Sequence, residues 1–289
     1  MESKNKLIEL PVAEWLTLRD MYLRDWPEHN TEYNALNNAI RLMEMDGERY
    51  GNEFKVLTLN GEWKSDGTFL LILDVPRAGT LLGTLGDNIE RLKSAVELLD
   101  STGERYFYSC VDKVKPAVHH YANVNHFTYT TPHPCIFHYL RKEDAVKLEI
   151  PKRDDVILKP LSEENAVTVN EIWPHRDKNS MPFVKRLINT DFTIGAFDKE
   201  TGELMAWCLR LPIGSLGLLQ VKEKYFRQGL GRLVTIAQAK QLAENGQDSS
   251  ATILFENTAS RTLFRSLGFF EWGERSWMFQ EGLGSGHYD

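Results

Sequence analysis

A short stretch near residue 225 has the residue types that hold a phosphate group on backbone amides. Residues 218–231 read LLQVKEKYFRQGLG, an apolar strand followed by a glycine-rich turn and the start of an amphipathic helix. The first N–H groups of a helix have no intrahelical acceptor and lie at the positive end of the helix dipole, so a turn that exposes them can bind an anion. The two turn glycines carry no Cβ and would let a bulky pyrophosphate approach. We therefore predict that consecutive amides bind the phosphate, namely those of Arg227, Gln228, Gly229, Leu230, Gly231 and Arg232.

The local charge favours a small anionic ligand. Between residues 222 and 232, four cations (Lys222, Lys224, Arg227 and Arg232) against one anion (Glu223) leave a balance of +3. The whole chain has 34 Lys and Arg against 41 Asp and Glu, a formal net charge of −7. A basic island on an acidic protein favours a discrete phosphorylated molecule over nucleic acid, whose backbone usually meets a broad basic face. The alternative is an ordinary solvated turn with surface lysines.

Spacing separates the known kinds of phosphate-binding turn. A Walker loop needs GxxxxGK followed by Ser or Thr, and the chain has no such run. A dinucleotide fingerprint needs Gly or Ala at position 234, which is Val234. The remaining pattern is Gln or Arg, two residues, Gly, one residue, then Gly or Ala. It resembles the acetyl-coenzyme-A turn of the GNAT acyltransferases, with Phe226 in place of the usual Gln or Arg.

Residues 257–269, NTASRTLFRSLGF, resemble the second GNAT signature. Asn257 is expected to cap a short helix that ends at Gly268. Phe264 stands at an aromatic position where many GNAT enzymes carry Tyr. The resemblance implies that acyl-coenzyme A contacts Asn257 and Phe264. It also implies that strand amides bind the pantetheine arm and polarise the thioester carbonyl, those near Leu219, Gln220 and Val221.

Within this superfamily, the chain resembles the glycine N-acyltransferase (FR47-like) family over residues 156–280. The similar stretches are VNEIW (169–173), FVKRLI (183–188) and WCL (207–209). The resemblance implies an α/β (α+β) GNAT fold, a mixed and mostly antiparallel sheet flanked by helices. It further implies a degenerate GNAT-like N-terminal domain over 1–145 and an acyl-coenzyme-A-binding catalytic domain over 146–289. The implied reaction moves an acyl group from coenzyme A to the amine of a small acceptor, such as the amino acid glycine, without a metal.

The general base is the weak point of the resemblance. The family is taken to use a glutamate at the start of the central strand, and the matching residue here is Ser215, which cannot act as a base near neutral pH without help. Glu256 is the other candidate, acting directly or through water; alternatively, it is a solvent-facing carboxylate near a helix N-terminus. These departures leave two other hypotheses open, an acyl-coenzyme-A-binding module without turnover and a protein N-acetyltransferase.

Composition limits the class of protein. The 289 residues are 42% hydrophobic, enough for two moderate cores. Three scattered cysteines (Cys110, Cys135 and Cys208) offer no disulfide framework. We find neither an apolar stretch long enough for a membrane span nor a secretory or Arg-rich N-terminal signal. We therefore expect an intracellular, cytoplasmic protein, and the family resemblance leaves a mitochondrial location open; the sequence does not predict an oligomeric state.

Hydrophobic periodicity predicts the elements around these motifs. In the first half we expect helices at 13–26, 32–45 and 89–99, and strands at 54–59, 69–74, 105–109, 126–130 and 136–140. After a connector at 141–155 we expect a strand at 156–159, two helices, and strands at 192–197 and 203–211. Residues of metal-binding type cluster in the first half: His119, His120, His126, His133, Cys135 and His138. Their spacing fits no standard zinc pattern, and several of them alternate with aromatics as strand residues would.

Overall fold

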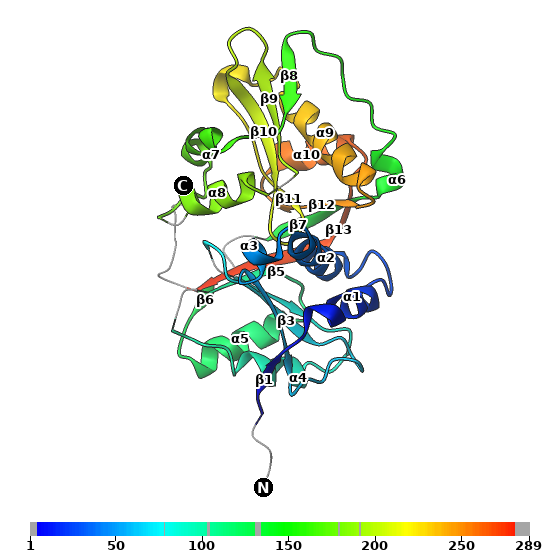
Figure 1. The fold of residues 1–289 in the computed structure, drawn as a ribbon, viewed down its shortest axis with the longest axis vertical. Helices are drawn as coiled ribbons and strands as arrows, with labels where there is room; N and C mark the ends of the chain where they lie inside the picture. The colour runs from blue at the N-terminus through cyan, green and yellow to red at the C-terminus, as the bar shows by residue number, and fades with distance from the viewer. Residues whose placement is uncertain are drawn as a thin grey trace. The chain divides into compact units, whose positions relative to one another are not determined.

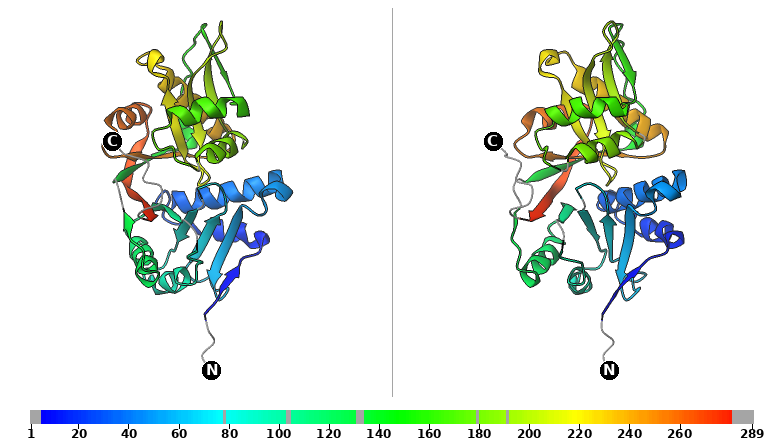
Figure 2. Two further views of the ribbon diagram at one scale, coloured as in Figure 1. Left: turned by 90° about the vertical axis from the view of Figure 1, so that its left-hand side faces the viewer. Right: turned by 60° about the vertical axis from the view of Figure 1, so that its left-hand side comes forward.

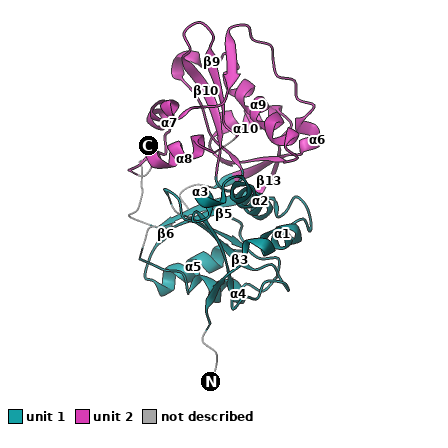
Figure 3. Cartoon of the chain, in the orientation of Figure 1, with its two compact units in different colours: residues 1–135, 212–214, 274–285 teal, residues 136–211, 215–273, 286–289 magenta. Residues whose placement is uncertain are grey.

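The computed structural model describes residues 5–77, 79–102, 105–130, 134–178, 180–190 and 192–280. The chain divides into two compact units (Figure 3). Unit 1 comprises the residues up to Cys135, Pro212–Gly214 and the segment from Glu274, and unit 2 comprises Ile136–Leu211 and Ser215–Gly273. Each unit has a mostly antiparallel sheet flanked by helices (Figure 1), which confirms the predicted fold class.

Unit 1 builds its sheet in the order β1-β2-β3-β4-β5-β13, and β6 also pairs with β13. The neighbours with recorded register are antiparallel except β4 and β5, which are parallel. Its helices and strands are β1 (Leu7–Glu9), α1 (Val12–Met21), α2 (Asn30–Met45), α3 (Gly47–Tyr50), β2 (Phe54–Leu59), β3 (Phe69–Leu73), β4 (Gly79–Gly83), α4 (Glu90–Val96), β5 (Tyr106–Cys110), α5 (Lys115–Val124) and β6 (Tyr129–Thr130).

Unit 2 repeats much of this order of elements. Its sheet runs β8-β9-β10-β11-β12-β7, with β11 and β12 parallel and β8 to β11 antiparallel. Its helices and strands are β7 (Cys135–Leu140), α6 (Lys142–Ala145), β8 (Val156–Lys159), α7 (Ala166–Ile172), α8 (Ser180–Ile188), β9 (Ile194–Asp198), β10 (Leu204–Arg210), β11 (Leu216–Val221), α9 (Leu230–Glu244), β12 (Ser249–Leu254), α10 (Thr258–Ser266) and β13 (Phe270–Gln280), the last of which continues into unit 1.

Two hydrophobic cores cover the two faces of the unit 2 sheet. Figure 2 shows helices on either side of its strands. Alternation along β10 assigns neighbouring side chains to opposite faces, because successive residues of a strand point to opposite sides. Trp207 packs with residues of α7 and α8, whereas Cys208 packs with residues of α9 and α10. Both side chains are fully buried. The strands that carry the predicted site are thus fixed by packing on both sides.

The structure corrects some predicted elements of the first half. Residues 115–124 were assigned no element, and the structure has helix α5 there (Lys115–Val124), which holds His119 and His120. Strands β1 and β4 were not predicted, because one is three residues long and the other is a short GTLLG run bounded by glycines. His133 lies outside the described residues.

All three cysteines are free and buried. Burial raises the pKa of Cys110 to about 12, of Cys135 to about 11 and of Cys208 to about 12, because a thiolate loses its hydration in an apolar environment. None of these thiols is therefore ionised near neutral pH.

Candidate functional site

A run of backbone amides with no acceptor lies at the start of α9. Within the described chain, none of the N–H groups of residues 227–232 donates a hydrogen bond to the protein. The first intrahelical bond recorded at this end runs from the Leu233 amide to the Gly229 carbonyl, at 3.0 Å. The preceding turn is closed by bonds from the Tyr225 and Phe226 amides to Lys222 and Glu223. Residues 227–232 therefore present six adjacent donors at the positive end of a 15-residue helix.

Left-handed backbone conformations give this turn its shape. Arg227 has φ +62° and Gly229 has φ +78°. A left-handed residue within a turn makes successive N–H groups converge into a concave anion-binding nest. A Cβ on Gly229 would meet no atom within 4 Å, so only its backbone conformation requires glycine there.

Gly231 is constrained by its neighbours and not by its backbone. A Cβ at this position would lie 3.5 Å from Val221 Cγ2 on β11 and 3.7 Å from Leu263 Cδ2 on α10. These are ordinary van der Waals separations, so an alanine fits and a larger residue does not. This matches the Gly or Ala that the acetyl-coenzyme-A pattern allows here.

Strand β11 separates from β12 shortly after the two strands meet. Within the described chain, their pairing is a single parallel pair, Leu216 with Ala251. A bulge in β11 lies just beyond this pair: Leu218 has φ +49°, and the register with β10 shifts between Trp207 and Leu209. Bulges commonly redirect backbone groups next to functional sites. The predicted pantetheine-binding residues Leu219, Gln220 and Val221 follow this bulge and are half-buried.

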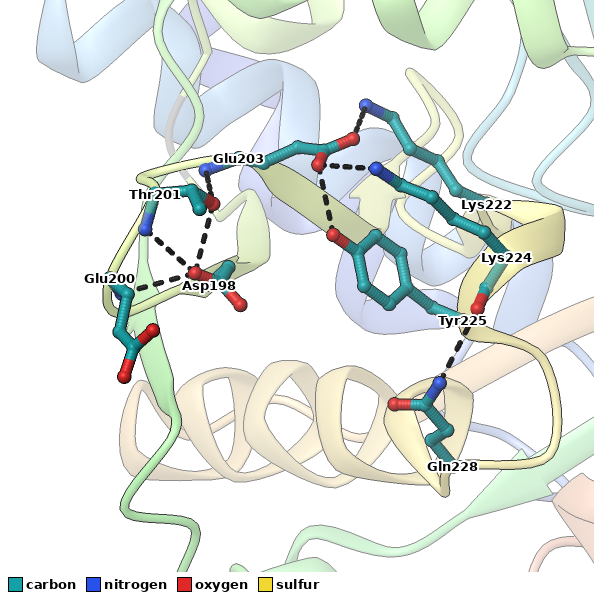
Figure 4. Close-up of polar contacts among 8 residues, drawn as sticks. All are labelled: Asp198, Glu200, Thr201, Glu203, Lys222, Lys224, Tyr225 and Gln228. Atoms are coloured by element: carbon teal, nitrogen blue, oxygen red, sulfur yellow. Dashed lines mark hydrogen bonds and ion pairs between the residues drawn. The ribbon is translucent and has the colours of Figure 1, made fainter.

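The two lysines counted in the basic island, Lys222 and Lys224, both pair with one carboxylate from the preceding hairpin (Figure 4). Glu203 immediately precedes β10. Its carboxylate accepts hydrogen bonds from Lys222 Nζ at 3.0 Å, Lys224 Nζ at 2.6 Å and the Tyr225 hydroxyl at 2.9 Å. Hydrogen bonds from Lys224, Lys222 and Tyr225 lower the pKa of the Glu203 carboxyl to about 2. The sequence count missed this partner, although antiparallel pairing of Ala206 with Val221 brings the two strand ends together.

Arg153 is a second contributor that the sequence count missed. It comes from the connector before β8 and donates from Nη1 to the Gln228 carbonyl at 2.8 Å. Asp155 holds the same guanidinium through two bonds, at 2.8 and 2.6 Å. The connector thereby places a cation against the amide run.

The second signature folds as predicted from its residues. The Asn257 side chain caps α10 by accepting the Ser260 amide at 3.0 Å, and Gly268 follows the helix with φ +87°. Phe264 is only 3% exposed, and its ring packs edge-on against Phe269 and His138 in the core. Asn257 is exposed at the end of β12, whereas Phe264 contributes to packing.

The structure does not bring the two candidate catalytic residues together. Ser215 is buried just before β11, and its Oγ has no hydrogen-bond partner among the described residues. Glu256 is exposed just past β12. Leu216 pairs in parallel with Ala251, so Ser215 lies near the beginning of both strands, whereas Glu256 lies in the turn that follows the end of β12 at Leu254. Glu256 therefore lies toward the phosphate end of β11 and Ser215 at the opposite end.

Among the residues that the structure describes, no group of three or more His, Cys, Asp or Glu is arranged to hold a metal ion. His138, one of the clustered histidines, is fully buried, and its Nδ1–H donates to the Ile136 carbonyl oxygen at 3.0 Å. Burial lowers the pKa of His138. No helix in the described part of the chain combines the length and apolarity needed to cross a bilayer.

Part of the chain matches a known protein-family model. Residues 193–278, which hold the amide run and the second signature, match the family model described as FR47-like protein. No curated protein matches the sequence.

Solved structures resemble nearly the whole chain. A Drosophila protein is 22% identical with a TM-score of 0.87, covering 96% of this chain and 99% of its own. A tandem GNAT protein from the clavulanic acid biosynthesis pathway is 13% identical with a TM-score of 0.56 and the same coverage, 96% and 99%. A GCN5-related N-acetyltransferase from Sphaerobacter thermophilus is 10% identical with a TM-score of 0.55, covering 96% of each chain. The chain thus has the fold of the GNAT proteins.

Proposed function

We propose that this protein is an acyl-coenzyme-A-dependent N-acyltransferase that acts on a small amine, such as the amino acid glycine. The observation that carries the proposal is the run of six unpaired amides at residues 227–232, directly after a strand that has separated from its parallel neighbour. Backbone amides in this arrangement match a pyrophosphate. The FR47-like match spans the same residues, and the neighbours named as GNAT proteins share the fold.

The ligand would follow β11 from its phosphate end toward its beginning. With the pyrophosphate on the amides of 227–232, the arm would run past Val221, Gln220 and Leu219 toward the bulge at Leu218. A backbone N–H near the bulge would then polarise the thioester carbonyl, as an oxyanion hole does. The coenzyme A thiol has an ordinary pKa near 8.5, so it leaves as a thiolate with little need of an acid, and a phenylalanine at position 264 is tolerable.

Deprotonation of the amine is assigned to the Ser215 end of the strand. In the register described above, Ser215 lies beyond the bulge from the phosphate turn, where the thioester would be. Its unpartnered Oγ could hold a water that relays the amine proton to solvent, whereas Glu256 lies past the other end of the paired strands, after Leu254 of β12. Positioning alone can supply a large part of the rate gain when the base is weak.

A second candidate is an acyl-coenzyme-A-binding module without turnover. It is favoured by the position of Glu256, past the end of β12, and by the buried Phe264, whose ring has no acidic hydroxyl to donate a proton. This candidate uses the same amides and predicts binding without release of the thiol.

Calorimetric binding of acetyl-coenzyme A, combined with thiol release over a panel of amino acids, separates these candidates. Gly229→Asp should abolish binding, because it adds a carboxylate to the amide run. Gly246→Asp is the matched control: Gly246 has φ +73°, has open space around its Cβ and lies at the other end of α9. Acceptor-dependent release supports the enzyme, and binding without release supports the module. Equal binding by both variants would show that the amides are not the site.

Ser215→Ala and Glu256→Gln then distinguish the two proposed bases. Under the proposal, Ser215→Ala lowers kcat at least tenfold with little change in coenzyme A affinity, because a relayed general base typically contributes 10²–10⁴-fold. Glu256→Gln leaves kcat within about twofold. The reverse result would assign the proton transfer to Glu256.

A further inference from the structure

Phe226 is the most exposed large hydrophobic side chain among the residues that the structure describes. It is 56% exposed, although its backbone is held by the bond from its amide to the Glu223 carbonyl at 3.0 Å. It immediately precedes the amide run, in the position where the GNAT pattern has Gln or Arg. An aromatic ring that is left in solvent beside a phosphate site is available for a flat apolar group of the same ligand.

Arg227, the next residue, is a cation without a protein partner. It is exposed and makes no recorded hydrogen bond or ion pair within the described chain. The other cations of the turn are engaged: Lys222 and Lys224 with Glu203, and Arg232 with the Ser266 hydroxyl at 3.0 Å. Arg227 is therefore the cation of this turn that can reorient toward a second phosphate.

We propose that Phe226 and Arg227 form a subsite for the 3′-phosphoadenosine end of coenzyme A. The adenine ring stacks on Phe226, and the Arg227 guanidinium binds the 3′-phosphate. This inference rests on the proposed function, because a pyrophosphate on the adjacent amides is what delivers the nucleotide to these two side chains. Aromatic stacking accepts any base face, and a guanidinium binds phosphate oxygens through two parallel bonds.

Ligands that lack one part of coenzyme A test each contact in the full chain by calorimetry. The probes are coenzyme A, dephospho-coenzyme A, which lacks the 3′-phosphate, and 4′-phosphopantetheine, which lacks the nucleotide. Phe226→Ala should weaken coenzyme A binding about 5- to 100-fold, the usual range for one aromatic–base stack, and leave 4′-phosphopantetheine unchanged. Phe226→Trp should retain the affinity. Arg227→Gln should weaken coenzyme A but not dephospho-coenzyme A.

The outcomes separate this inference from the proposed function. If wild type binds neither coenzyme A nor 4′-phosphopantetheine, the proposed function fails and the subsite fails with it. If wild type binds both and Phe226→Ala weakens both equally, Phe226 only shapes the turn and the subsite is overturned. The subsite is also overturned if Phe226→Ala leaves the affinity for both ligands unchanged. It is likewise overturned if Arg227→Gln weakens the binding of coenzyme A and of dephospho-coenzyme A equally.

Discussion

The two glycines of the turn should respond in opposite directions to the same substitution. Gly229 has φ +78° and open space at its Cβ, so alanine there has only a backbone cost. An alanine in the left-handed conformation destabilises the fold by about 1–2 kcal/mol, and the lower entropy of the unfolded chain offsets about 0.4–1 kcal/mol of this. We therefore expect Gly229→Ala to lower the free energy of unfolding by about 1 kcal/mol. Gly231 lies inside α9, where its added methyl meets Val221 and Leu263 at 3.5 and 3.7 Å. Gly231→Ala should therefore raise the free energy of unfolding by about 0.5–1 kcal/mol.

Urea denaturation of the two variants measures this difference. With a slope of about 1–3 kcal/mol per molar urea, Gly229→Ala should lower the midpoint by about 0.3–1 M, and Gly231→Ala should raise it slightly. Gly246→Ala is a control with the same open space and φ +73°, and it should lose about as much as Gly229→Ala. Wild-type stability in Gly229→Ala, together with a loss in Gly246→Ala, would refute the left-handed conformation at 229 and the shape proposed for the amide run.

Three further predictions concern side chains around the turn. Glu203→Gln should lower stability at neutral pH. The pKa of Glu203 is about 2 in the folded protein and 4.5 ordinarily, so the stability difference between wild type and Glu203→Gln should shrink as pH falls from 4.5 to 2 and vanish below 2. Urea midpoints measured across pH test this, and a difference that stays constant would contradict the ion pairs. Asn257→Ala should cost about 1 kcal/mol in urea denaturation through loss of the α10 cap, whereas Asn257→Ser should restore most of it; equal losses would argue against the cap. Arg153→Ala should weaken acetyl-coenzyme A binding, measured by calorimetry, less than about fivefold, because exposed charged contacts contribute less than about 1 kcal/mol. Complete loss of binding would mean that Arg153 binds the ligand directly.

The parts of the site that the sequence could predict are those set by neighbours in the chain. The start of α9 and the Asn257 cap of α10 depend on glycine and on short side chains a few residues apart. The fold class followed from the resemblance carried by these same local motifs. Residues whose role depends on a few neighbouring positions are readable without knowing the tertiary structure.

Contacts between distant segments were not readable from those motifs. Glu203 binds Lys222 and Lys224 only because β10 and β11 pair in one particular register, and Arg153 reaches the turn from a connector 75 residues away in sequence. The positive φ of Leu218 also has no marker in its residue type, since leucine rarely adopts it. Helix α5 was missed because it has only 10 residues and two of the four side chains that it buries are alanines, Ala117 and Ala122, which give a weak hydrophobic signal.

Because all three cysteines are buried, the folded protein has no thiol that reacts readily with a thiol reagent. A reagent that titrates free thiols at neutral pH would report coenzyme A released by turnover and not the folded chain, since each buried thiol has a pKa of about 11 or 12. A single cysteine introduced at an exposed position would likewise be the sole reactive residue of the native protein. A fluorophore attached there could report ligand arrival at the turn directly, without first removing any native side chain.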